Sequence, residues 1–129
     1  MITVLRLGHR AGRDDRISTH VGLTARQWGA DEVVYAGEKD ESMMESLQDT
    51  IDRWGGHMDV RYENNFQSVI NNFDGTKIHL TMYGQKVDEK KEDILEEFND
   101  TETGDDVLII VGAEKVPSSI YRKSDFNIS

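Results

Sequence analysis

The alternation of apolar and polar positions along the chain predicts strands that take turns with helices. Apolar and β-branched runs predict strands at 2–7, 32–36, 58–62, 76–82 and 107–111. Apolar residues at helical spacing predict helices at about 19–28, 40–54 and 86–99, with shorter ones at 66–73 and 118–121. Because alternating strands and helices form βαβ units, the predicted class is α/β, a mostly parallel sheet flanked by helices.

Two of these segments carry more specific expectations. The strand at 107–111 is a continuous apolar run, which is typical of a strand buried on both faces of a parallel sheet. The helix at 86–99 carries charges on most of its circumference, so we expect a wide face in water.

Composition narrows the classes of protein that the chain can belong to. Its 129 residues show no compositional shift, which predicts one domain over 1–129. The absence of cysteine excludes a disulfide framework, a thiolate nucleophile and a cysteine zinc site. No apolar run approaches the roughly 20 residues of a membrane span, and the first strand begins beside Met1, without a signal peptide, so we expect a cytoplasmic location and no membrane partner.

Charge is distributed unevenly along the chain. The net charge is −10, yet the first 26 residues hold five Arg against two Asp, so this part is +3 and the rest is −13. Four of these arginines lie within or beside the glycine-containing segment 8–18: Arg6, Arg10, Arg13 and Arg16. This asymmetry predicts an anion or polyanion at one face of an otherwise acidic protein.

Three glycine-containing segments follow predicted strands, at 8–18, 83–84 and 112–116. In parallel sheets the ligand lies where loops leave the carboxyl ends of strands, so these three loops are expected to converge. Any one glycine is explained as well by the end of a strand, and only the set points to a site.

Several familiar kinds of site are not supported. The chain contains neither a G-x-G-x-x-G after its first strand, nor a G-x-x-x-x-G-K-[ST], nor a G-x-S-x-G elbow. The four histidines have no partner at a metal-binding spacing, so we predict no metal site and expect hydrogen-bonded structural roles for His9, His20, His57 and His79.

The chain resembles a known family over essentially its whole length. The blocks that carry the resemblance are LRLGHR at 5–10, RD at 13–14, RI at 16–17, THV at 19–21, LTAR at 23–26, GADEV at 29–33, RWGG at 53–56, HLTMYG at 79–84 and IVGAEKVP at 110–117. In this order and spacing they closely resemble the archaeal tRNA cytidine-56 2′-O-methyltransferases.

The resemblance implies the SPOUT class of methyltransferase, with a trefoil knot near the C-terminus and an active site built across a homodimer. The expected activity is transfer of a methyl group from S-adenosyl-L-methionine to the ribose 2′-oxygen of cytidine 56 in the T loop of tRNA. Carried onto this chain, the expected cofactor-binding residues are Leu80, Thr81, Gly84, Gly112, Ala113, Glu114, Lys115, Val116 and Ile128.

The arginine-rich segment would serve the chemistry. A ribose hydroxyl must be positioned and must lose its proton as it attacks a sulfonium methyl, which requires no metal. SPOUT relatives assign a role in this step to an arginine of the first motif, so we expect Arg16, and after it Arg13, to be catalytic. The expected tRNA contacts are Arg6, Arg10 and Arg13, while Asp14 and Asp15 are expected to orient the arginines or to cap the next helix.

The chain departs from the family at two places. Ala11 stands where relatives usually have proline, and the chain stops at Ser129, where relatives continue into a third cofactor motif and a closing helix. We therefore expect the knot segment to be incomplete. Two other readings stay open at this stage: a non-catalytic nucleotide- or RNA-binding module of the same fold, and a flavodoxin-like domain.

Overall fold

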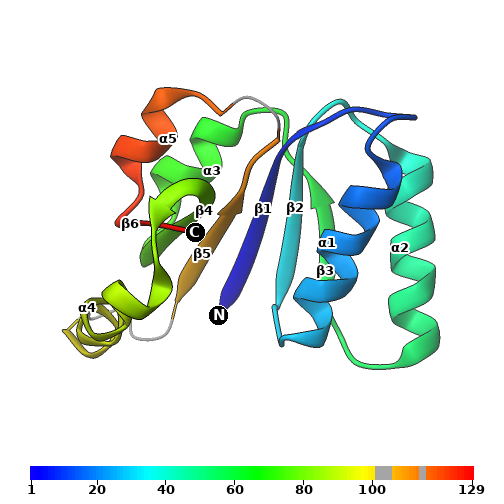
Figure 1. The fold of residues 1–129 in the computed structure, drawn as a ribbon. Helices are drawn as coiled ribbons and strands as arrows, with labels where there is room; N and C mark the ends of the chain where they lie inside the picture. The colour runs from blue at the N-terminus through cyan, green and yellow to red at the C-terminus, as the bar shows by residue number, and fades with distance from the viewer. Residues whose placement is uncertain (101–105, 114–115) are drawn as a thin grey trace.

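The computed structural model describes residues 1–100, 106–113 and 116–129, with the side chains of 98–100 left out. Strands and helices alternate as the sequence predicts (Figure 1). In chain order they are β1 (Ile2–His9), α1 (Asp15–Gln27), β2 (Glu32–Gly37), α2 (Glu41–Trp54), β3 (Asp59–Tyr62), α3 (Phe66–Asn72), β4 (Thr76–Gln85), α4 (Val87–Asp100), β5 (Val107–Val111), α5 (Ser118–Lys123) and β6 (Phe126–Ile128).

All six strands belong to one parallel sheet with the order β3-β2-β1-β5-β4-β6. The α/β prediction is therefore confirmed. β1 lies inside the sheet and pairs on one side with β2, where Leu5 faces Val34, and on the other with β5, where Leu5 faces Ile110. As a result the carboxyl ends of β1, β5, β4 and β6 follow one another along a single edge.

Helices cover both faces of the sheet because neighbouring strand residues point to opposite sides. On one face Val4 and Val33 pack with residues of α1 and α2, among them Ala25 and Leu47. On the other face Leu5, Val34 and Leu108 pack with Ile70 of α3 and Ile120 of α5. Figure 1 shows α1 and α2 together at one end of the sheet and α3 and α5 together at the other.

The first loop is shorter than the sequence indicates. β1 continues to His9, and α1 begins at Asp15, about four residues before the predicted start. The first turn of α1 is closed by the bond from Ser18 N to Asp14 O, 2.8 Å long. Arg16 therefore lies on a helix, while Arg10 and Arg13 lie in the turn between β1 and α1.

β6 is missing from the sequence-based prediction. Its three residues pair with β4, so that Ile78 faces Phe126 and His79 faces Asn127. So short a segment shows no period in sequence, and only its place beside β4 makes it a strand.

The prediction that β5 is buried on both faces is wrong for one face. Leu108 and Ile110 are buried, but Ile109 and Val111 are half-buried and face an apolar hollow of about 370 Å³ that Val4 and Leu80 also line. By contrast, the expected water-facing surface of α4 is confirmed, because even Val87 and Leu95 are half exposed. No helix within the described residues is long and apolar enough to cross a membrane.

Candidate functional site

The carboxyl end of β1 and the loop after β5 meet at the edge of the sheet. The guanidinium Nη1 of Arg6 donates to the carbonyl oxygen of Gly112 over 2.5 Å. Gly8 has a φ of 67°, and a Cβ added there would lie 2.8 Å from Cβ of Ala113. Only glycine allows both this backbone conformation and this close approach. Of the three segments predicted to converge, 8–18 and 112–116 meet here, whereas Gly84 of the third lies against Asn127 and Ile128 of β6.

The ends of β4 and β6 form the neighbouring part of the edge. Ser129 N donates to the carbonyl oxygen of Gln85 over 2.9 Å, and the pairing of β4 with β6 slips between Leu80 and Gln85. Thr81 Oγ1 is 2.9 Å from the hydroxyl of Tyr121 in α5.

The structure therefore gathers most of the predicted cofactor residues on one sheet edge. Leu80, Thr81 and Gly84 lie on β4, Ile128 lies on β6, and Gly112, Ala113 and Val116 lie in the loop after β5. The remaining two predicted residues, Glu114 and Lys115, lie outside the described residues.

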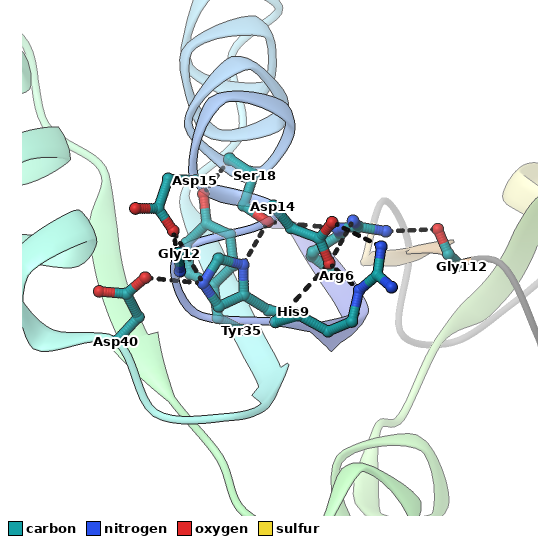
Figure 2. Close-up of polar contacts among 10 residues, drawn as sticks. Arg6, His9, Gly12, Asp14, Asp15, Ser18, Tyr35, Asp40 and Gly112 are labelled. Carbon is teal, nitrogen blue, oxygen red and sulfur yellow. Dashed lines mark hydrogen bonds and ion pairs between the residues drawn. The ribbon is translucent and has the colours of Figure 1, made fainter.

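Arg6 lies below the surface of this edge. Its side chain is 5% exposed, and its Nη2 lies 4.0 Å from Asp14 Oδ2. Its Nε donates to Ser18 Oγ over 3.4 Å (Figure 2). Burial lowers the pKa of Arg6 from its ordinary value, and the Asp14 carboxylate opposes that shift. This position favours a structural role for Arg6 over the predicted contact with a tRNA phosphate.

Arg10 and Asp14 form a two-pronged ion pair. Arg10 Nε donates to Asp14 Oδ2 and Nη2 donates to Oδ1, each over 3.1 Å, and the Arg10 backbone N–H donates to Oδ2 over 3.0 Å. These bonds hold the pKa of Asp14 below its ordinary value. The expectation that Asp14 orients an arginine is confirmed for Arg10.

His9 joins the same network from the other side. Its Nδ1 lies 2.6 Å from Ser18 Oγ, and its Nε2 lies 2.9 Å from Asp40 Oδ2 (Figure 2). The bond from His9, followed by one from the Met43 backbone N–H, lowers the pKa of Asp40. Met43 N–H donates over 3.1 Å to the other oxygen of Asp40, so that this carboxylate caps α2.

The structural role expected for His9 is confirmed by these bonds. Asp15 Oδ1 also lies 3.8 Å from His9 Nε2, so the ring and two carboxylates face one another within the described residues. Sequence spacing does not reveal this cluster, because Asp40 comes from a different loop. The shortest contact in this cluster, between His9 Nε2 and Asp40 Oδ2, is an ordinary histidine–carboxylate hydrogen bond.

Arg13 and Arg16 are placed differently from Arg6. Both side chains are exposed, Arg13 in the turn and Arg16 on the first turn of α1. Arg16 lines a shallow surface hollow with Asp15, Thr19, His20 and Leu23. Two guanidiniums thus face solvent beside the junction of the loops, where they can bind a polyanion.

Another histidine is buried beneath the loop after β5. His79 on β4 is fully buried, and its Nδ1 lies 3.0 Å from Asn127 Oδ1 on β6. Its Nε2 has no hydrogen-bond partner among the described residues. Sequence reasoning identifies His79 only as part of a motif, because its neighbours come from β6 and α5.

The C-terminal part of the chain matches a known protein family. Residues 54–129 match the family model described as tRNA ribose 2′-O-methyltransferase, aTrm56.

Curated relatives resemble the whole chain. A tRNA (cytidine(56)-2′-O)-methyltransferase of Pyrococcus horikoshii is 48% identical over 129 residues, which are 100% of this chain and 62% of the relative. Its counterpart in Pyrococcus abyssi is 45% identical over 100% of this chain and 64% of the relative. The one in Thermococcus kodakarensis is 44% identical over 100% of this chain and 71% of the relative. The chain thus spans less than two thirds of the two Pyrococcus proteins.

A solved structure shares the fold. The crystal structure of a probable methyltransferase from Bordetella pertussis superimposes with a TM-score of 0.65 over 98% of this chain and 79% of that chain. The two sequences are only 12% identical, so this likeness concerns the arrangement of the sheet and its helices alone.

Proposed function

Because the chain belongs to the tRNA ribose 2′-O-methyltransferase family, we propose that it carries the fold and site elements of an S-adenosyl-L-methionine-dependent enzyme that methylates the ribose 2′-oxygen of cytidine 56 in the T loop of tRNA. The observation that carries the proposal is the bond from Arg6 to Gly112. It holds the arginine-rich segment beside the loop expected to bind the cofactor, so a bound methyl group and a bound RNA can meet at one edge.

The residues at this edge fit a nucleoside cofactor with an apolar part. Leu80, Thr81, Met82 and Ile128 line an open, mostly apolar hollow of about 520 Å³. Thr81 and Ser129 supply the polar groups among the residues that line this hollow. Such a combination of apolar surface and few polar groups is typical of ligand sites.

In the proposal, S-adenosyl-L-methionine is held by the residues that the resemblance implies: Leu80, Thr81, Gly84, Gly112, Ala113, Glu114, Lys115, Val116 and Ile128. When bound, the cofactor supplies an electrophilic methyl group on a sulfonium sulfur. The protein's own contribution is to place the ribose hydroxyl in line with that group, which is the main source of catalysis when no metal takes part.

The exposed arginines serve the RNA. Arg16, and after it Arg13, bind the phosphate beside the target ribose and orient its hydroxyl, because a guanidinium matches two phosphate oxygens at once. Arginine stays protonated, so its positive charge also stabilises the negative charge that develops on the ribose 2′-oxygen as the hydroxyl loses its proton. Arg10, whose side chain is half exposed although it forms an ion pair with Asp14, makes a further contact with an RNA phosphate. In this proposal Arg6 holds the loop that begins at Gly112 and does not make the tRNA contact that is expected from the sequence.

A second subunit completes the proposed site. Three large apolar side chains are about four-fifths exposed: Trp28, Met82 and Tyr83. Trp28 also lines one apolar hollow together with Leu80, and a contiguous exposed apolar surface marks an interaction site, which supports the homodimer that the resemblance implies. A tRNA substrate places the activity in the cytoplasm.

A paired binding and transfer experiment tests the proposal. Calorimetry should show binding of S-adenosylhomocysteine, the demethylated product, and a radiolabelled methyl group should pass from S-adenosyl-L-methionine to unmodified tRNA. The matched control is a tRNA with 2′-deoxycytidine at position 56, which lacks the acceptor oxygen and should take up no label. Binding of tRNA and cofactor without transfer would instead identify a non-catalytic module, and absence of cofactor binding would contradict the proposal.

A further inference from the structure

The side chain of His79 is fully buried, yet only one of its two ring nitrogens is hydrogen-bonded within the part of the chain that the structure describes. Its ring packs edge-to-face on Tyr121, with centroids 4.8 Å apart, and its Nδ1 lies 3.0 Å from Asn127 Oδ1. Nε2 is buried without a partner among the described residues. Buried polar atoms are nearly always paired, so this nitrogen requires an explanation.

The neighbours of His79 determine which nitrogen carries the proton. Asn127 Nδ2 donates to the carbonyl oxygen of Tyr121 over 3.1 Å, which orients the amide so that Oδ1 faces His79. A carbonyl oxygen can only accept, so Nδ1 of His79 must donate. In the tautomer that carries its proton on Nδ1, Nε2 has no hydrogen atom and is a hydrogen-bond acceptor.

This acceptor faces the underside of the loop after β5. A Cβ built on Gly112 would lie 3.9 Å from His79 Nε2. The carbonyl oxygen of the same glycine accepts the bond from Arg6. The Val116 side chain packs against this glycine, since its Cγ2 is the atom nearest to the same Cβ. His79 Nε2 therefore lies next to the start of the loop that is proposed to bind the cofactor.

We propose that His79 Nε2 accepts a hydrogen bond from the nucleoside part of the cofactor, through the adenine amino group or a ribose hydroxyl; this inference rests on the proposed function. A neutral donor suits the position better than the ammonium of the methionine part. The guanidinium of Arg6 already donates to the carbonyl oxygen of Gly112, and a second buried cation beside this residue would repel it.

Nuclear magnetic resonance of histidine-labelled protein tests this directly. In the free protein, the ¹⁵N shift of His79 Nε2 should be that of an unprotonated ring nitrogen, and Nδ1 should be protonated. Adenosine and S-adenosylhomocysteine should each move the Nε2 signal towards that of a hydrogen-bonded acceptor, whereas methionine alone should leave it in place. A protonated Nε2 in the free protein would overturn the inference.

Two variants separate a ligand contact from a purely structural role. Asparagine in His79→Asn keeps a donor near the Nδ1 position and lacks an acceptor at Nε2, whereas the longer glutamine in His79→Gln brings an amide oxygen to that place. We expect His79→Asn to weaken S-adenosylhomocysteine binding about tenfold, and His79→Gln to recover most of it. Thermal denaturation of both variants shows how much each one destabilises the fold.

The outcomes distinguish the inference from the proposed function. Unchanged affinity in His79→Asn, with the Nε2 signal unmoved by a ligand that calorimetry shows to be bound, would mean that an internal water satisfies Nε2, and the inference would be wrong while the function stands. If the unaltered protein binds no S-adenosylhomocysteine, the proposed function fails and takes the inference with it.

Discussion

Four arginines of one short segment have different surroundings, and their surroundings decide what each can do. Arg6 is buried between Asp14 and Gly112, and Arg10 is held by Asp14. Arg13 and Arg16 are exposed at the surface. A buried, bonded guanidinium positions the backbone, whereas an exposed one can bind phosphate without giving up an existing partner.

The proposed role of Arg16 predicts a selective loss. Arg16→Ala should lower methyl transfer to tRNA by about a hundredfold or more, because the hydroxyl loses its positioning group. Cofactor affinity should stay within twofold, since the side chain points into solvent on α1. Single-turnover transfer and calorimetry measure the two effects. Arg53→Ala makes the same charge change on an exposed part of α2 and should be neutral; equal activity in both variants would remove Arg16 from the mechanism.

The ion pair of His9 and Asp40 predicts a dependence of stability on pH. The pKa of Asp40 is lowered in the folded protein, chiefly by His9, so the carboxylate contributes stability above its unfolded pKa of about 3.9. That stability is lost as the pH falls through the lower, folded pKa. Urea unfolding between about pH 7 and about pH 2, which lie roughly three units above and two units below the unfolded pKa, should show this loss of unfolding free energy.

Asp40→Asn isolates the charge in this experiment. Asparagine still caps α2 through its side-chain oxygen but has no carboxylate to titrate. The variant should be less stable at neutral pH and should lose less stability in acid than the unaltered protein. A variant with the same acid slope as the unaltered protein would show that Asp40 does not contribute to it.

At the scale of elements, the site depends on the short connection between β1 and α1. β1 brings Arg6 and His9 to the edge of the sheet, and α1 starts early enough to place Ser18 between them. Tyr35 of β2 donates to the carbonyl oxygen of Ser18 over 2.6 Å, which ties α1 to the sheet at this point. The turn after β1 is therefore held both by buried side chains of regular elements and by its own bonds between Arg10 and Asp14.

Gly8 near the end of β1 and Gly12 in the turn after it offer a matched test of contact with the loop after β5. Gly8 and Gly12 both have left-handed backbone, with φ of 67° and 77°, but a Cβ at Gly8 would meet Ala113, whereas one at Gly12 would meet nothing within 4 Å. Gly12→Ala should cost roughly 1–2 kcal/mol in unfolding free energy through backbone strain alone.

Gly8→Ala should cost about 1–3 kcal/mol more, because the added methyl overpacks the contact with the Gly112 loop. Cofactor affinity should fall in Gly8→Ala only. Urea denaturation and calorimetry of both variants measure these differences. Similar losses of affinity in the two proteins would show that backbone strain, not contact between the loops, controls the cofactor site.

At the scale of the whole molecule, the strand order brings segments that are distant in sequence together at one candidate site. β5 inserts between β1 and β4, so Gly8 meets Ala113 and His79 meets Gly112 although they are far apart in the chain. The net charge of −10 repels RNA everywhere except near the exposed arginines. Binding to tRNA is therefore expected to be local and sensitive to salt.

The salt dependence of tRNA binding should report the number of arginine contacts. The slope of log affinity against log salt is about −0.7 to −0.9 for each phosphate contact. Arg13→Ala and Arg16→Ala should each reduce its magnitude by roughly one, and Arg53→Ala should leave it unchanged. Fluorescence anisotropy with labelled tRNA at several salt concentrations measures the slope. A slope that is the same in all four proteins would place the tRNA contacts elsewhere.

The sequence by itself determined the elements that are long enough to show a period. The helix over Glu41–Trp54 and the strand over Val107–Val111 follow from the spacing of their apolar side chains. It also predicted an anion at one face, through the arginines, and a ligand site, through the glycine-containing segments after strands, whereas the expected methyl transfer came from the family resemblance. Each of these signals lies within one local stretch of the chain, where spacing and propensity act without help from distant residues.

Only the tertiary structure decided which residues meet. The order of the strands in the sheet determines several features that the sequence does not show. These are the strand β6, the half-buried face of Ile109 and Val111, the burial of Arg6, and the His79 Nε2, which has no hydrogen-bond partner among the described residues. Strand order and side-chain burial arise from packing between segments that are distant in sequence. For this reason the arginines could be recognised as a group from their sequence, whereas the separate part that each one plays follows from where the fold places it.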